Sequence, residues 1–192
     1  MIAWLPDNDF QYLLKSIGYS MIPRVVNFFV EFLKREVVVL TISVEERNRS
    51  VKELLNGTYT SLKTVVPIKH EIAKPQLLEQ LLHIQFGVLI GITGDVKGKL
   101  VLAGDTATFG SIGEAMFGMP VEGEMLSSFS GELGNMIAGS LSTNIVKEGI
   151  NTDITSPTII EGNTKLSGFE RAIKVTVDFD QVGEMEIYLL LD

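Results

Sequence analysis

Four residues within the segment 125–148 have types that could do chemistry on another molecule. Ser128, Glu132, Asn135 and Gly139 follow one another at steps of three or four positions. At about 100° per residue in an α-helix, all of them fall within about 60° of one another. A hydroxyl, a carboxylate, an amide and a residue without a side chain therefore share one stripe of the predicted helix.

The carboxylate and the amide offer complementary chemistry. Glu132 can accept hydrogen bonds, pair with a lysine or act as a base, whereas Asn135 can donate and accept at once and so can orient a water molecule. Neither has an adjacent nucleophile, histidine or metal ligand, which a self-contained hydrolytic site would need. The pair would instead suit a protein that adds two groups to another protein's reaction centre. Phosphoryl transfer works in this way, because orientation and electrostatics dominate its catalysis.

The spacing of this pair is weak evidence by itself, because Glu-x-x-Asn recurs at Glu45/Asn48, Glu53/Asn56 and Glu148/Asn151. Glu132 and Asn135 differ from these copies in context, with an outward mid-helix position, Ser128 one turn earlier and Pro157 in the next strand. Gly139 costs about 1 kcal/mol relative to alanine inside a helix. Either a partner approaches the helix closely at that point, or the sheet or another helix of the same chain does.

The elements that must position this stripe follow from hydrophobic periodicity. Residues 84–103 and 172–191 alternate with period two and contain turn residues, which predicts two β-hairpins. The remaining predicted elements are a helix over 51–66 opened by a Ser50/Glu53 capping box, a short helix from Asp105 to Gly118, the long helix 125–148, and a strand over 153–161 interrupted by Pro157. This order predicts an α+β fold, with a mostly antiparallel sheet and two or three helices packed on one face.

The first 45 residues have a different pattern and are predicted to form an N-terminal extension, partly helical, ahead of a domain over 46–192. Helices are expected over 10–17 and 25–35, and residues 37–44 resemble a β-rich run because valine is frequent there. The extension could be an extra layer packed on the domain or a docking or dimerising segment. Both interpretations remain open.

Composition excludes several classes of function. The chain of 192 residues has a net charge of −8 at pH 7, which disfavours nucleic-acid binding. It has no cysteine, so disulfides and thiol catalysis are excluded, and His70 and His83 lack the spacing of a metal site. No apolar run approaches the roughly 18–20 residues of a membrane span, and no leader peptide is expected. A cytoplasmic protein without a metal or membrane contact is therefore predicted.

Ser128, Glu132, Asn135 and Pro157 together resemble the CheC/CheX/FliY phosphatase family of bacterial chemotaxis, and most of all CheX. That family carries Asp or Ser, three residues, Glu, two residues, Asn, and then a proline about twenty-two residues later. The hairpin segment 87–105 and the short segments 135–139 and 156–160 are also similar to the family. The resemblance covers about residues 50–192 and leaves the first 45 outside it.

The resemblance implies a CheX/CheC-like fold and a hydrolase that removes the aspartyl phosphate from a CheY-like receiver domain of a response regulator. Glu132 would pair with a lysine of the receiver, and Asn135 would orient the attacking water. Ser128, Gly139 and Pro157 would support them. The protein would need no cofactor of its own, because Mg²⁺ would belong to the partner, and it would form a homodimer.

Two alternatives remain open within the same family. Glu53 and Asn56 occupy the helix where CheC has another copy of the motif, but Arg49 replaces the Asp or Ser and no proline follows at the family's spacing. They form either a second site or an ordinary solvated surface. The whole chain could also be a receiver-binding or flagellar-switch-like scaffold without catalysis.

Overall fold

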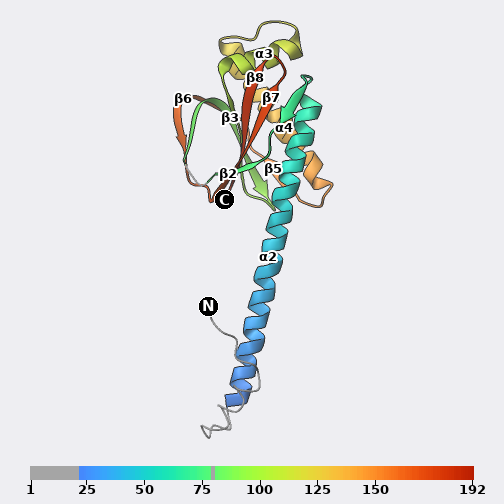
Figure 1. Cartoon of the computed structure of the whole chain (residues 1–192), viewed down its shortest axis with the longest axis vertical. Coiled ribbons are helices and arrows are strands. Elements are labelled where there is room, and N and C mark those ends of the chain that lie inside the picture. Colours follow the sequence, from blue (N-terminus) through green and yellow to red (C-terminus); the bar gives the residue numbers. More distant parts are fainter. Residues whose placement is uncertain (1–21, 79–80) are drawn as a thin grey trace. The chain divides into compact units, whose positions relative to one another are not determined.

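The computed structural model describes residues 22–78 and 81–192, except for the side chains of residues 22–26, 37–44 and 47 (Figure 1). Contacts divide the chain into two compact units, one ending at Arg49 and the other covering Ser50–Asp192. The second unit contains the sheet, the described helices that cover it, and all residues of the predicted stripe.

A single helix, α2 (Ile22–Val65), occupies most of the region where several elements were expected. The predicted β-rich run over 37–44 is wrong, and so is the predicted helix start at Ser50. The chain has no proline or glycine between Pro23 and Gly57, so nothing in the backbone interrupts the helix. Valine's preference for strands is weak and yields to the helical spacing of the apolar residues. The helix expected over 10–17 lies outside the described residues.

The described strands form one antiparallel sheet, as predicted. Its order is β1-β7-β8-β4-β3-β5, with β2 also paired to β7 and β6 also paired to β3. The two predicted hairpins are confirmed as β3–β4 and β7–β8. The strands are β1 (His70–Ile72), β2 (Gln76–Leu78), β3 (Leu82–Gly94), β4 (Gly98–Gly104), β5 (Thr152–Ile154), β6 (Thr158–Leu166), β7 (Arg171–Phe179) and β8 (Gly183–Leu191).

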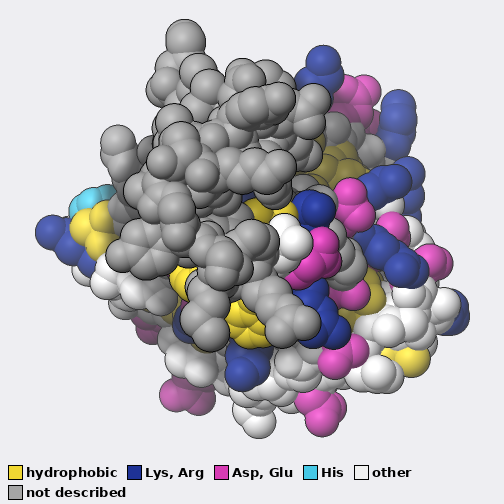
Figure 2. Space-filling model, turned by 90° about the horizontal axis from the view of Figure 1, so that it is seen from below, with side chains coloured by type: hydrophobic (Ala, Val, Ile, Leu, Met, Phe, Trp, Pro, Cys, Tyr) yellow, Lys and Arg dark blue, Asp and Glu magenta, His cyan; other side chains and the backbone are white. Residues whose placement is uncertain are grey.

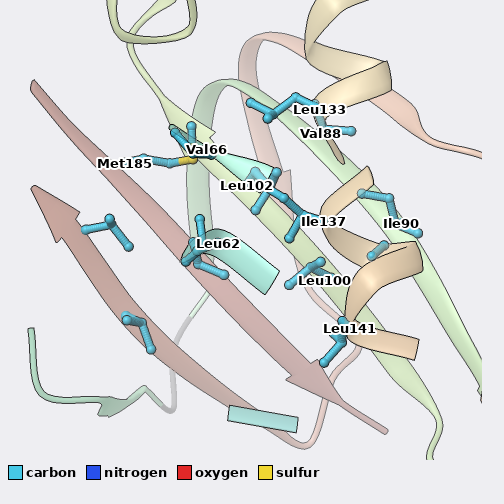
Figure 3. Packing of buried hydrophobic residues seen from close by; sticks show 14 of the residues in the cluster. Leu62, Val66, Val88, Ile90, Leu100, Leu102, Leu133, Ile137, Leu141 and Met185 are labelled. Carbon is cyan, nitrogen blue, oxygen red and sulfur yellow. The ribbon is translucent and has the colours of Figure 1, made fainter. Parts of the chain in front are cut away.

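Three helices cover one face of this sheet, which confirms the α+β fold. Helix α3 (Thr106–Phe117) ends at Gly118, whose φ of 71° is left-handed, and α4 (Glu124–Val146) follows it. Together with the C-terminal part of α2, they bury one cluster of side chains against the inner face of the sheet (Figure 3). Labelled members of this cluster are Leu62 of α2, Val66 just after it, Val88 and Ile90 of β3, Leu100 and Leu102 of β4, Leu133, Ile137 and Leu141 of α4, and Met185 of β8.

Two glycines allow α4 to lie unusually close to its neighbours. A Cβ atom at Gly134 would lie 2.8 Å from Val88 Cγ1 and 3.0 Å from Ile90 Cδ1, both on β3. A Cβ atom at Gly57 of α2 would lie 2.7 Å from Leu141 Cδ1 of α4. Such distances are below ordinary van der Waals contact, so only glycine fits without displacing the packing. The contacts fix both the depth and the rotation of α4 on the sheet.

The opposite face of the curled sheet has its own smaller apolar cluster, which includes Val101 and Tyr188. Beside it, the Tyr188 hydroxyl donates to Glu186 Oε2 at 2.5 Å, and Lys174 Nζ donates to Glu186 Oε1 at 2.8 Å. Burial acts to raise the pKa of Glu186, but the hydrogen bonds from Lys174 and Tyr188 and the charge of Lys174 outweigh it, and the pKa is lowered. Burial and the bond to Glu186 raise the pKa of Tyr188.

Glu186→Gln should therefore weaken the fold at neutral pH more than in acid. Because the folded-state pKa of Glu186 lies below the unfolded value, its stabilisation is present above the unfolded pKa and disappears as pH falls through the folded pKa. We expect a loss of about 1 kcal/mol or less at pH 7, since the pair is partly exposed, and a smaller loss at pH 3. Urea unfolding at both pH values measures this difference. The control is the exposed Glu184, and an equal pH effect of Glu184→Gln would contradict the assignment.

Candidate functional site

Helix α4 presents the predicted stripe to solvent beside a cleft. Ser128, Glu132 and Asn135 are exposed, whereas Phe129, Leu133 and Ile137 on the other side of the helix are buried. The cleft has a volume of about 480 Å³, and the three exposed residues line it together with Pro157, which is half-buried. The structure thus brings together four residues that sequence reasoning selected from two separate elements.

The second wall of the cleft is the segment that joins β5 to β6. Its lining residues are Ile154, Thr155, Ser156, Pro157 and Ile159. The amide of Thr155 donates to Gly91 O at 3.0 Å, and the amide of Gly91 donates to Thr155 Oγ1 at 2.8 Å. A Cβ atom at Gly91 would lie 2.9 Å from Thr155 Cγ2, so glycine makes room for this side chain. The wall is thereby held to β3, the strand on which α4 also packs.

Two serine hydroxyls of α4 form hydrogen bonds to the strands on either side of this wall. Ser127 Oγ donates to Glu161 Oε1 of β6 at 2.8 Å, and Ser142 Oγ donates to Thr152 O of β5 at 2.9 Å. The two bonds lie on either side of Glu132 along the helix. The helix on one side of the cleft is therefore joined at two points to the strands that flank the other side, which gives a site a rigid frame.

The functional groups of the stripe are available to another molecule. Within residues 22–78 and 81–192, no hydrogen bond or ion pair joins Glu132, Asn135 or Ser128 to another side chain. A carboxylate and an amide are left side by side in solvent, where a partner's donors and a water molecule can reach them. The support that Ser128 was expected to give Glu132 stays a prediction, because no bond joins the two in the free protein.

Gly139 faces open space, and Met136 is an exposed apolar residue near Glu132 on the same helix. No atom of the described residues lies within 4 Å of a Cβ placed on Gly139, so the interpretation that the sheet or another helix approaches it is wrong. Met136 is 40% exposed. At about 40° from Glu132 it lies at the edge of the buried face. With Met125, which is 46% exposed, it adds apolar surface along the same side of α4 as Glu132.

The Glu53/Asn56 copy of the motif does not line the cleft. Asn56 is exposed on α2, but Glu53 is half-buried, so the expectation that both are exposed is wrong for Glu53. Neither residue is among those that line the cleft. A second site at this position stays a prediction.

The described part of the chain has neither a cluster of metal ligands nor a membrane-spanning helix. It contains no group of three or more histidine, aspartate or glutamate side chains that could hold a metal ion. None of its helices combines the length and apolar character that crossing a bilayer requires. On the face seen in Figure 2, the described Lys and Arg side chains are interspersed with Asp and Glu.

Sequence reasoning missed the residues that build and hold the second wall, among them Ser127, Thr155 and Ser156. Thr155 and Ser156 directly precede Pro157, so the expected role of the proline was a signal for them. Ser127 gave no such signal, because its bond to Glu161 depends on where β6 lies beside α4. That placement comes from sheet pairing between segments far apart in the sequence.

The family comparisons agree with this geometry. A family model described as "Chemotaxis phosphatase CheX" matches residues 86–179, which include the whole of α4 and the second wall. The curated "CheY-P phosphatase CheX" of Thermotoga maritima is 29% identical over 149 residues, covering 73% of this chain and 94% of the relative. Over these residues the chain is therefore similar to CheX of the CheC/CheX/FliY family.

Solved CheX structures have the same fold. A CheX from Desulfovibrio desulfuricans has a TM-score of 0.63 at 19% identity, and the match covers 73% of this chain and 97% of that chain. The CheX–CheY–BeF3–Mg²⁺ complex from Borrelia burgdorferi gives a TM-score of 0.62 at 22% identity, covering 73% of this chain and 96% of that chain. The family-model match begins inside β3, so it does not include α2.

Alanine at Gly139 should stabilise the free protein, whereas alanine at Gly134 should destabilise it. Both changes remove a mid-helix glycine of α4 and gain about 1 kcal/mol of helix preference. At Gly134 this gain is exceeded by overpacking against Val88 and Ile90, which typically costs about 1–3 kcal/mol. Thermal or urea unfolding of the two variants provides a matched comparison. Destabilisation of equal size in both would mean that Gly139 has a packing role inside the chain.

Proposed function

We propose that this chain is a phosphatase that hydrolyses the aspartyl phosphate of a CheY-like receiver domain. The observation that carries the proposal is the pairing of Glu132 with Asn135, exposed and unpartnered on α4 at the rim of an open cleft. A relative at 29% identity is named CheY-P phosphatase CheX, which supports the same reaction for this chain. The Glu/Asn pair would complete a reaction centre that the receiver itself provides.

Asn135 would act by positioning the nucleophile. Its carboxamide oxygen accepts a hydrogen bond from water while its NH₂ group can donate, so it holds one water molecule in a defined direction. In-line attack of that water on phosphorus breaks the bond to the aspartyl oxygen and yields inorganic phosphate and a free carboxylate. Because this reaction depends on alignment, one amide in the correct position can account for a large part of the acceleration.

Glu132 would act on the receiver rather than on the phosphate. Its carboxylate would pair with a lysine beside the phosphorylated aspartate and so fix the depth and direction at which α4 inserts. Mg²⁺ bound by the receiver would offset negative charge on the transferred group. A solved CheX complex containing CheY, BeF3 and Mg²⁺ supports a receiver of this kind as the partner. The exposed Met125 and Met136 would add apolar contact area on either side of Glu132.

Asn135→Ala should remove most of the phosphatase activity without unfolding the chain. Asn135 is exposed and makes no bond within the described structure, so its loss should leave stability nearly unchanged. Removing one group that aligns or stabilises the reacting atoms typically lowers the rate by about 100-fold or more. Release of inorganic phosphate from a phosphorylated CheY, with the wild-type chain and the variant, measures the effect.

The matched control is Asn56→Ala, which removes the exposed asparagine of the other motif copy. The proposal assigns the reaction to the α4 site alone, so this variant should accelerate dephosphorylation as the wild type does. Equal rates for wild type and Asn135→Ala would contradict the catalytic assignment. Binding of phosphorylated CheY without any acceleration would identify the chain as a receiver-binding scaffold instead.

A further inference from the structure

The N-terminal part of α2 exposes a continuous set of large apolar side chains. Its exposed members are Phe28 at 70%, Phe29 at 60%, Val30 at 41%, Phe32 at 51% and Leu33 at 53%. Scattered apolar residues are normal on protein surfaces, but a contiguous group of this size marks a surface that contacts something else. Neither the family-model match nor the predicted phosphatase site includes this part of the helix.

The spacing of valine and leucine along this segment indicates which kind of partner it contacts. Counting from residue 26, valine or leucine occupies six successive positions at alternating steps of four and three. Alternating steps of four and three place these residues at the two apolar positions of a heptad repeat, the pattern of a coiled coil. The first type of position, a, is always valine, at Val30, Val37 and Val44; the second, d, is held by Val26, Leu33 and Leu40.

The residue types at a and d indicate how many helices form the coiled coil and whether they run parallel. β-Branched residues at a and leucine at d favour two parallel strands, because the two positions pack against the facing helix in different geometries. From Ile22 to Arg49 the helix is about 42 Å long at 1.5 Å per residue, enough to hold all six positions. We propose that residues 26–44 of α2 pair with the same residues of a second copy as a parallel two-stranded coiled coil.

The paired segment has a clear end in the sequence. Arg47 occupies the next d position and interrupts the apolar repeat. Val51 and Leu54 continue the same phase, but Leu54 is fully buried in the core of the Ser50–Asp192 unit and is not available to a second chain. The seam is therefore confined to residues 26–44.

A lipid surface fits this segment less well than a second copy. Glu31 and Lys34 lie inside the apolar segment, 3.5 Å apart as an ion pair, and Arg35 and Glu36 follow them directly. All four residues are exposed and fall outside the a and d positions, as charged residues of a coiled coil do. No described helix is long and apolar enough to cross a membrane.

Site-directed cross-linking can test this pairing cleanly, because the chain has no cysteine of its own. In a parallel two-stranded coiled coil the two copies of residue 33 face each other across the seam, within the Cα separation of about 5.5–6 Å that a disulfide needs. Leu33→Cys in the full-length chain should form covalent dimers on mild oxidation. Phe28→Cys is the matched control, because residue 28 is also exposed but lies at the outward f position of the repeat.

We expect cross-linking at residue 33 to be at least about tenfold faster than at residue 28, as measured on non-reducing gels after fixed times. Circular dichroism of both variants checks that α2 and the sheet remain folded. Equal rates at the two positions would indicate random collision and overturn the proposal. Absence of a disulfide between two copies of residue 33 would also overturn the proposal. That result is expected if another part of the same chain covers the seam, or if the two helices pair antiparallel. A link that forms only after phosphatidylglycerol vesicles are added would assign the face to lipid instead. None of these outcomes depends on phosphatase activity.

Discussion

The close contact between α4 and β3 at Gly134 determines what the rest of the site can do. At about 100° per residue, Gly134 lies about 200° from Glu132 on the helix. Pressing Gly134 against Val88 and Ile90 therefore turns Glu132 and Asn135 away from the sheet. A larger residue at that contact would have to lift or rotate the helix, and either movement would redirect both functional groups together.

The second wall of the cleft is held to the same strand, β3, against which α4 packs. Thr155 is held by two hydrogen bonds to Gly91, a residue of the strand on which α4 rests. Ser127 and Ser142 then join α4 to β6 and β5 on either side of Glu132 and Asn135. The positions of carboxylate, amide and wall are therefore coupled through one strand, so the cleft has a defined shape in the free protein. A preformed site suits a protein whose contribution is alignment, because little ordering remains to oppose docking.

Most of the fold of the Ser50–Asp192 unit could be predicted because its signals are local. The β3–β4 and β7–β8 hairpins follow from alternation and turn residues, and the exposed stripe on α4 follows from helical angles alone. The second wall of the cleft could not be predicted in this way. The bond from Ser127 to Glu161 and the place of Thr155 beside Gly91 depend on pairing between distant segments. Gly139 was recognised as unusual, but only coordinates could separate a contact inside the chain from open space.

The two wrong predictions for α2, a β-rich run over 37–44 and a helix start at Ser50, have one physical cause. Both rest on local residue preferences, whereas the helical periodicity of the whole segment determines its structure. Four adjacent residues from Val37 to Leu40 favour strand by composition, yet Val37, Leu40 and Val44 also keep a helical spacing. Ser50 and Glu53 would cap a helix if a break preceded them, but no glycine or proline supplies one. Within a continuous helix the pair simply occupies polar positions.

The continuity of α2 also explains why its apolar pattern looked irregular. The phase set by Val30, Val37 and Val44 passes on to Val51 and Leu54 without a shift. In the C-terminal part of the helix, Leu54 is buried by the sheet and helices of its own unit. In the N-terminal part, Val30 and Leu33 keep the same phase but remain exposed. Among the described side chains, apolar residues of this phase are thus buried at Leu54 and exposed at Val30 and Leu33. Apolar residues at heptad positions that remain exposed, as Val30 and Leu33 do, are consistent with contact with a second chain rather than with water.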